Sequence, residues 1–342
     1  MRYGVCYKGS KNGIAEWIYS HFPKATNFYD LFAGGCAVTQ IALMKSEYKN
    51  YFCNDIDDDG IKLFLDAIHG KYANEKRWIS RDDFFRLKDS EPYIRYCWSF
   101  GNNGRDYLYS KEIEPYKKAW HYAIYFHDYS LAKELGLNLE SIEPIKDIYD
   151  RYIATKRITE KFTDENMSRE ISFERQQQLE ALNRLQSQQS LQSLQSQQSL
   201  QSQQSLQSLQ SLQSLQSLQS LQSLQSLQSS NLSYEKVKIH KDSVVFCDIP
   251  YVNTNSYGNK KDNNGFDYDR FYSWCGRQTE LVLISEYKMP DSFICVDSIE
   301  KPVTLSSGTS LKAIEKLFIP KHQKELWKSV KPKVYRQLEF SF

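Results

Sequence analysis

The sequence predicts a doubly wound α/β domain that is interrupted by an insertion. Residues 1–90 alternate between strand-like and helix-like patterns, and residues 236–342 return to that alternation. The region between them differs in composition, being rich in Tyr, Lys and Glu and then in Ser, Leu and Gln. Strands that alternate with helices are typical of a mostly parallel sheet covered by helices. We therefore expect one core domain whose two parts are separate in sequence and fold together.

The first part of the core begins with a strand, a tight glycine turn, a helix and a second strand. Apolar runs bounded by turn residues indicate the strands, and apolar residues at helical spacing indicate the helices. The predicted elements are a strand at Asn27–Phe32, a helix at Ala37–Ser46, a strand at Asn50–Asn54 and a helix at Ile61–Ile68.

The second part of the core is predicted to supply the remaining strands. A short apolar run leads into Asp-Ile-Pro-Tyr, and a second apolar run follows it. Two further runs near the end are predicted to form a late pair of strands. The four predicted strands are Ser243–Cys247, Leu281–Ser285, Phe293–Asp297 and Lys301–Leu305.

A Ser-Leu-Gln triplet dominates the tract from Gln176 to Ser230. A period of three matches neither a helix nor a strand, so its leucines form no stable apolar face. We interpret the tract as a low-complexity insertion, either disordered or loosely helical, and assign it no chemistry. A helical arm that pairs with another copy is the alternative. The expected boundaries are 1–90 and 231–342 for the core, 91–175 for a largely helical recognition region and 176–230 for the repeat.

Composition excludes several classes of protein. Lys and Arg total 44 against 42 for Asp and Glu, so the balance neither indicates nor excludes a nucleic-acid partner. The seven cysteines are scattered without a Cys-x-x-Cys pair, which argues against a disulfide framework or a zinc site, and no metal is expected. The polar N-terminus lacks a signal core, and no apolar run approaches the ~20 residues that cross a bilayer. We expect a cytoplasmic protein.

The first candidate site is the segment Asp30-Leu31-Phe32-Ala33-Gly34-Gly35. A strand delivers Asp30 and Phe32 to its carboxyl end, and Gly34 and Gly35 let the backbone turn tightly and approach a ligand. The following helix start offers free N–H groups. Because the Gly-x-Gly-x-x-Gly pattern of a dinucleotide site is absent, a nicotinamide dehydrogenase is disfavoured.

Asp55 is the second candidate, at the end of the next predicted strand. An acidic side chain at this place can accept hydrogen bonds from both ribose hydroxyls of an adenosine. Three more aspartates, Asp57, Asp58 and Asp59, follow it. The alternative is a solvated acidic turn that caps the next helix.

The third candidate is Asp248-Ile249-Pro250-Tyr251, also at a strand end. A carboxylate or a backbone carbonyl here can accept hydrogen bonds from an adenine amine, and Tyr251 can stack on a base taken out of a duplex. Pro250 stiffens the turn. Taken alone, such a tetrapeptide can arise by chance at a strand end, but three strand-end signals together favour a shared site.

Two of these segments, with a third near the N-terminus, resemble the motifs of the Dam-type DNA adenine-N6 methyltransferases. Asp30–Gly35 resembles that family's cofactor motif and Asp248–Tyr251 its catalytic tetrapeptide. Tyr7-Lys8-Gly9-Ser10-Lys11 is similar to its N-terminal aromatic-x-Gly-x-Lys motif. The order of the motifs also agrees. The resemblance covers about residues 1–110 and 236–330, and the repeat tract lies outside it.

The resemblance implies a fold, an activity and a set of roles. The fold is a Rossmann-like methyltransferase with a mostly parallel seven-stranded sheet and an inserted target-recognition region. The activity is site-specific transfer of a methyl group from S-adenosylmethionine to the exocyclic amine of a flipped adenine in double-stranded DNA. The tetrapeptide would act on the adenine, with Tyr251 stacked on it. The implied cofactor-binding residues are Tyr7, Lys11, Asp30, Phe32, Gly34, Gly35, Asp55 and Asp248.

One position departs from the family pattern, which has proline where this chain has Ile249. The backbone carbonyl survives there, but the rigidity of a second proline is lost. We expect activity to be retained. Similar tetrapeptides in RNA adenine methyltransferases keep an RNA substrate open, and the same core occurs in enzymes that methylate protein glutamine. A catalytically inactive DNA-binding homologue is another alternative.

The region after residue 90 is expected to contact DNA. Asn suits adenine edges, Arg suits guanine edges and Lys suits phosphates. An ordinary solvated loop and helix is the alternative for each residue. A partner restriction endonuclease and a monomer or weak dimer are also expected. The candidate DNA-binding residues are Asn102, Asn103, Arg105, Lys117 and Lys118.

Overall fold

The computed structural model describes residues 3–72, 74–162, 224–251, 265–304 and 310–330. Its contacts divide the chain into two compact units, which are described separately. The core unit comprises Met1–Gly70 and Glu180–Phe342, and the insert unit comprises Lys71–Leu179. This division places the first boundary at Gly70, whereas the sequence analysis placed it at residue 90.

The described part of the core unit holds a seven-stranded sheet in the order β3-β2-β1-β4-β5-β7-β6. The first five strands in that order run parallel, and β7 is antiparallel to both of its neighbours. The predicted α/β fold with a mostly parallel seven-stranded sheet is confirmed. The strands are β1 (Asn27–Asp30), β2 (Asn50–Asn54), β3 (Leu227–Ser230), β4 (Ser243–Cys247), β5 (Leu281–Glu286), β6 (Phe293–Thr304) and β7 (Ser310–Pro320).

The central strands are buried on both faces, as is usual in parallel sheets. Every residue of β1, β4 and β5 is buried. On one face, Tyr29, Val245 and Val282 pack in a cluster that also contains residues of α11. On the other face, Phe28 and Phe246 contact the ring of Phe22. The helices of this unit are α1 (Ala15–Tyr19), α2 (Ala37–Lys45), α3 (Asp59–Ile68), α11 (Tyr268–Gly276) and α12 (Lys324–Val330).

The end of the Ser-Leu-Gln tract forms strand β3 at the edge of the sheet, so its interpretation as disordered or loosely helical was wrong for Leu227–Ser230. Asn54 at the end of β2 holds the strand in place. Its side chain donates hydrogen bonds to the carbonyls of Leu31 and Leu232 and accepts from the Leu232 N–H and the Ser230 hydroxyl. The pairing therefore depends on residues just after the repeat. Residues 176–223 lie outside the described ones.

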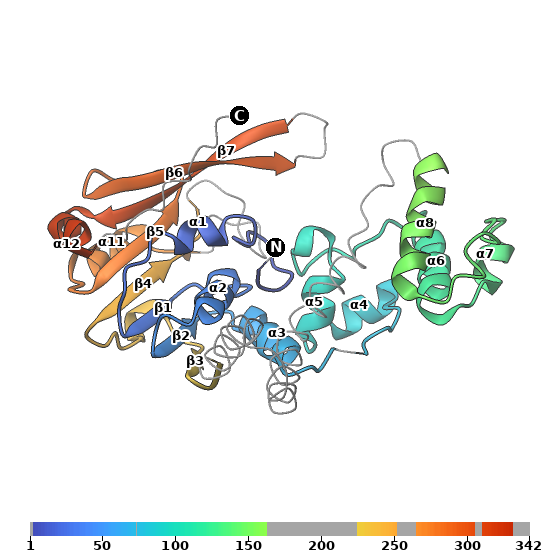
Figure 1. Cartoon of the computed structure of the whole chain (residues 1–342), viewed down its shortest axis with the longest axis horizontal. Helices are drawn as coiled ribbons and strands as arrows, with labels where there is room; N and C mark the ends of the chain where they lie inside the picture. Colours follow the sequence, from blue (N-terminus) through green and yellow to red (C-terminus); the bar gives the residue numbers. More distant parts are fainter. Residues whose placement is uncertain (1–2, 73, 163–223, 252–264, 305–309, 331–342) are drawn as a thin grey trace, which may run out of the picture. The chain divides into compact units, whose positions relative to one another are not determined.

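The predicted late pair of strands was wrong in its boundaries. Phe293–Asp297 and residues 301–304 belong to one strand, β6, and its partner is β7, which the sequence analysis did not predict. A register shift lies between Cys295 and Asp297, within the first of the two predicted strands, and β6 continues through residues 298–300 without a break. The two strands form a long antiparallel ribbon at the sheet edge (Figure 1).

The described part of the insert unit is largely helical. Small residues of α6, Ala119 and Ala123, pack with Ala132 and Ile142 in a cluster of its own. A second group is aromatic, with Trp78 stacked on Tyr109 at 5.7 Å between ring centroids. No helix among the described residues is both long and apolar enough to cross a membrane. The helices are α4 (Arg81–Leu87), α5 (Pro92–Cys97), α6 (Glu114–Phe126), α7 (Ser130–Glu134) and α8 (Ile148–Phe162).

Replacing Asn54 tests whether its side chain anchors β3. We expect Asn54→Ala to lower the free energy of unfolding by about 1–3 kcal/mol, because buried backbone groups lose their partners. Gln228→Ala, an exposed position of β3 itself, should change it by less than about 0.5 kcal/mol. Urea unfolding of both variants measures the difference. Equal effects would show that Asn54 has no special role.

Candidate functional site

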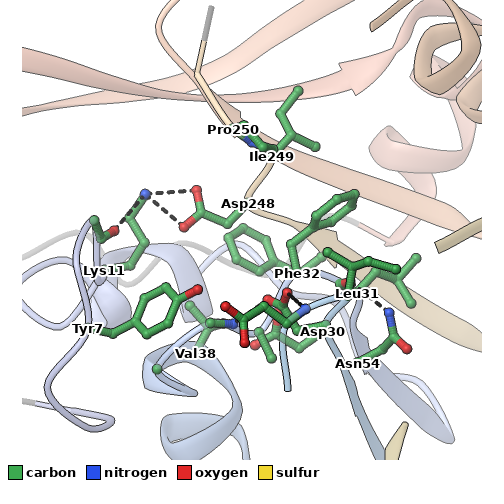
Figure 2. Close-up of a pocket in the computed structure, with 18 of the residues that line it drawn as sticks. Tyr7, Lys11, Asp30, Leu31, Phe32, Val38, Asn54, Asp248, Ile249 and Pro250 are labelled. Carbon is green, nitrogen blue, oxygen red and sulfur yellow. Dashed lines mark hydrogen bonds and ion pairs between the residues drawn. The ribbon is translucent and has the colours of Figure 1, made fainter. Parts of the chain in front are cut away.

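A cavity of about 580 Å³ lies at the carboxyl ends of β1, β2 and β4. Adjacent parallel strands have their carboxyl ends at the same edge of the sheet, so the polar residues that follow β1, β2 and β4 lie close together. All of the residues predicted for the cofactor and for the tetrapeptide line this one cavity (Figure 2). They are Tyr7, Lys11, Asp30, Phe32, Gly34, Gly35, Asp55, Asp248, Ile249, Pro250 and Tyr251.

The glycine turn after β1 makes room for other parts of the protein. Gly34 has φ of +47°, and a Cβ there would lie 2.9 Å from the ring of Tyr7. A Cβ on Gly60, near the start of α3, would collide with the carbonyl oxygen of Gly34. The space that these glycines leave is thus used by other protein atoms. The Tyr7 ring packs directly against the turn at Gly34. The sequence analysis did not single out Gly60.

Asp55 is held in place by backbone N–H groups. The N–H of Gly34 donates to one carboxylate oxygen at 2.8 Å, and the N–H of Asp57 donates to the other at 3.0 Å. The N-cap position of α3 is Asp58, so Asp55 does not cap that helix. Burial raises the pKa of Asp55 to about 6, although these hydrogen bonds lower it. The side chain is therefore oriented before any ligand binds.

Asp30 is a buried carboxyl with one oxygen left to accept a hydrogen bond. The hydroxyl of Thr39 donates to Oδ2 at 2.8 Å, whereas Oδ1 has no hydrogen-bond partner among the described residues. Burial raises the pKa of Asp30 to about 7, and the charges of Asp248 and Asp55 add to this effect. A buried acceptor without a partner is costly, so a donor or a cation in the cavity would be favoured there.

Lys11 forms a buried ion pair with Asp248. Its Nζ lies 2.7 Å and 2.8 Å from the two carboxylate oxygens, and it also donates to the carbonyl of Gly9 (Figure 2). The same ammonium group lies 4.6 Å from the centroid of the Tyr251 ring. The sequence analysis expected Lys11 to contact the cofactor, and it did not predict this pairing. Removing one partner would leave a buried charge unpaired, which is strongly destabilising.

The tetrapeptide is stiffened by packing at the position where a second proline is missing. Ile249 is buried in the cluster that contains Phe271 and Ile284. The hydroxyl of Tyr268 donates to the carbonyl of Pro250 at 2.8 Å. A branched apolar side chain in a packed core has little freedom, so the loss of rigidity expected at Ile249 is offset by burial.

Several residues that line the cavity or support it were not predicted. Tyr234 and Phe266 form an aromatic wall with Phe32, at 5.5 Å and 5.9 Å between ring centroids. Ser285 and Glu315 bind the phenol of Tyr251. Ser285 follows the apolar residues of β5, and a polar residue at such a strand end could have been recognised from the sequence as a candidate for the site. Glu315 lies within β7, which was not predicted, so no pattern in the sequence marked it as a candidate.

The candidate DNA-binding residues all belong to the insert unit. The side-chain oxygen of Asn103 accepts from the N–H groups of Arg105 and Asp106, so it stabilises its own turn. Lys117 lies over the Trp120 ring and Lys118 over the Tyr122 ring, at 4.8 Å and 5.8 Å from the centroids. The predicted contacts of Asn102, Asn103, Arg105, Lys117 and Lys118 with DNA stay predictions.

Comparison with models of protein families identifies a match. A family model described as D12 class N6 adenine-specific DNA methyltransferase matches residues 7–272 of this chain. The matched region runs from the Tyr7 motif through the glycine turn and the tetrapeptide into α11. None of the curated proteins compared with the sequence matches it.

Gly60→Ala tests the close contact under the glycine turn. Alanine in a helix would normally add stability, but here its methyl group meets the backbone of Gly34. We expect the free energy of unfolding to fall by about 2 kcal/mol or more. Gly13→Ala, which meets no atom within 4 Å, serves as the control. Thermal and urea unfolding check this, and an unchanged Gly60→Ala protein would contradict it.

The raised pKa of Asp30 predicts how stability varies with pH. Because its folded pKa of about 7 lies above the ordinary value of 3.8, the carboxyl favours folding below pH 4 and this contribution is lost as the pH rises to 7. Asp30→Asn should therefore gain stability over the parent across that range, at a rate approaching about 1.4 kcal/mol per pH unit. Unfolding in urea between pH 4 and 8 measures it. A difference that does not vary with pH would refute the prediction.

Proposed function

Since the chain belongs to the D12 class N6 adenine-specific DNA methyltransferase family, we propose that methyl transfer to adenine takes place in the cavity beside Asp248. The enzyme methylates the N6 amine of adenine in DNA, as the family match shows. The observation that carries the proposal is the convergence of three separate motifs on one cavity. No observation favours an RNA or protein substrate, or an inactive homologue.

We propose that the methyl donor is S-adenosylmethionine, which supplies a methyl group on a positively charged sulfonium. The residues present fit such a molecule. Asp30 offers an acceptor without a partner, and the carboxylate of Asp55 is oriented by Gly34 to receive ribose hydroxyls. The aromatic wall of Phe32, Tyr234 and Phe266 offers flat apolar surface for an adenine ring.

Asp248 is proposed to bind the amine that receives the methyl group. The nitrogen is a poor nucleophile, because its lone pair is delocalised into the adenine ring. A hydrogen bond to the Asp248 carboxylate, with a second to the Ile249 carbonyl, would favour the pyramidal and reactive nitrogen. The ion pair with Lys11 orients the carboxylate. The amine would then attack the methyl carbon as the bond from that carbon to the sulfonium breaks. The donor would leave as a neutral thioether, the methylated nitrogen would lose a proton to solvent, and alignment would supply much of the rate.

Tyr251 is proposed to stack on an adenine that has been flipped out of the duplex. Its ring lies beside Asp248 in the same cavity, so a stacked base would present its amine to the carboxylate. Tyr7, fixed against the glycine turn, would border the methyl donor. Double-stranded DNA as the form of the substrate, a partner restriction endonuclease and a monomer or weak dimer stay predictions.

Removing the carboxylate of Asp248 tests the reaction. Purified protein is incubated with S-adenosylmethionine and unmethylated DNA, and the digested nucleosides are measured by mass spectrometry. We expect N6-methyladenine from the parent and a loss of at least about 10²-fold in Asp248→Ala, because the acceptor for the amine is gone.

The control for that assay is Asp269→Ala, an exposed position on α11, which should keep the parent rate. Asp248→Asn also removes the charge but keeps the shape of the side chain, and its amide oxygen can still accept a hydrogen bond from the Lys11 ammonium. Circular dichroism confirms that the compared variants are folded. Full activity in a folded Asp248→Ala protein would overturn the assignment.

A further inference from the structure

The phenol of Tyr251 is held at its far end by two strands that follow it in the sequence. Its hydroxyl donates a hydrogen bond to Oε2 of Glu315 on β7 at 2.6 Å. The Oγ of Ser285 on β5 lies 2.7 Å from the same hydroxyl. Because the single phenolic proton goes to the carboxylate, the serine hydroxyl donates to the phenol. Both hydrogen-bonding positions of the phenol are thus occupied.

These contacts lie in the interior. Ser285 is fully buried, and Glu315 is 3% exposed. Burying a carboxylate costs desolvation free energy. The hydrogen bond from the phenol, which is itself bonded to the serine, offsets part of this cost. Glu315 pairs with Ile299 of β6, and the next residue, Lys316, pairs with Glu286 of β5. The hydrogen bond from the Tyr251 phenol gives the buried Glu315 carboxylate a specific partner.

The electrostatics keep the phenol as a donor. Burial raises the pKa of Tyr251 well above its ordinary value of 10, and the charges of Asp248 and Glu315 raise it further. The hydroxyl therefore keeps its proton at neutral pH. Hydrogen bonds that involve an ionised partner are stronger than those between neutral groups. The link from Tyr251 to Glu315 is consequently the stronger of the two.

The order of the strands in the sheet determines which strands the Tyr251 hydroxyl can reach. Tyr251 follows β4, which pairs with β5, and β5 pairs with β7. The phenol therefore ties the segment after β4 to the two strands beside it. The phenol oxygen lies on the axis about which the ring rotates, so holding this oxygen fixes the direction of that axis. A phenolic O–H prefers to lie in the plane of its ring, so the directions of the two hydrogen bonds favour one orientation of the plane. Tyr287 contacts the ring in a T-shaped arrangement at 4.5 Å between centroids.

We propose that Glu315 and Ser285 are positioning residues that fix the ring plane of Tyr251 for stacking on the target adenine. This rests on the proposed function of Tyr251. Stacking aligns the amine with Asp248 only if the ring is held to within about 0.5 Å and 10–20°. Glu315 lines the cavity beside the phenol, and in this scheme it affects methyl transfer through the phenol. Its loss should lower kcat for methyl transfer and leave affinity for the methyl donor unchanged.

A double-mutant cycle between Glu315 and Tyr251 tests the link. Glu315→Ala and Tyr251→Phe each break it from one end, and each should lower kcat by about tenfold. If the two residues act through one hydrogen bond, the double variant should also lose about tenfold, rather than the hundredfold of independent sites. Glu315→Gln, which still accepts from the phenol, should retain more activity than Glu315→Ala.

The matched control is Glu300 on β6, an exposed glutamate opposite Ile314 of β7. Glu300→Ala should keep the parent kcat and should combine additively with Tyr251→Phe. Binding of S-adenosylhomocysteine, measured by calorimetry, should stay within about twofold of the parent in every variant. A general loss of structure would weaken this binding and lower activity in all backgrounds alike.

A readout that needs no methyl transfer separates this proposal from the proposed function. 3-Fluorotyrosine placed at position 251 gives a fluorine resonance that should shift in Glu315→Ala and Ser285→Ala but stay unchanged in Glu300→Ala. An unshifted resonance, or additive losses of kcat in the Glu315 cycle, would overturn the proposal. If the resonance shifts in Glu315→Ala and Ser285→Ala but the parent protein methylates no DNA, the hydrogen bonds to the phenol would be supported and the proposed function overturned.

Discussion

The register of three parallel strands determines where the carboxyl groups of Asp30, Asp55 and Asp248 lie in the cavity. Asp30, the last residue of β1, pairs with Cys53 of β2 and with Phe246 of β4. The chain therefore delivers Asp55 and Asp248 just beyond the same edge of the sheet. Three carboxyl groups in one buried place repel each other, and Lys11 is paired with one of them. A cavity of this charge suits a positively charged methyl donor.

The insertion separates strands that must pair, and the fold tolerates this. β2 ends at Asn54, whereas its neighbour β3 begins at Leu227 and β4 begins at Ser243. The entropic cost of closing a loop grows only slowly with its length, so a long insertion costs little more than a short one. The insert unit also has a core of its own around α6. The central sheet can thus be completed by strands from distant parts of the sequence.

The strand ends were predictable and the contacts between them were not. Asp30, Asp55 and Asp248 each follow an apolar run, and parallel strands bring such residues together by geometry alone. The partner of Lys11 depends on two segments that are 237 residues apart, which no local pattern encodes. Strand β3 was missed because a triplet period carries no strand signal. Glu315 was missed because β7 itself was not predicted, and because a polar residue in a strand normally faces solvent, whereas this one is buried.

Strand β3 is anchored at its carboxyl end, so the pairing of β3 with β2 does not depend on the length of the repeat that precedes it. Asn54 contacts Ser230 and Leu232, and Leu227–Ser230, in the described part of the tract, pair with β2. Gain or loss of whole triplets by slippage during replication of the gene, upstream of Leu227, would present the same four residues to β2. The number of triplets is therefore free to drift between lineages, while a frame change of one residue next to Ser230 would not be tolerated.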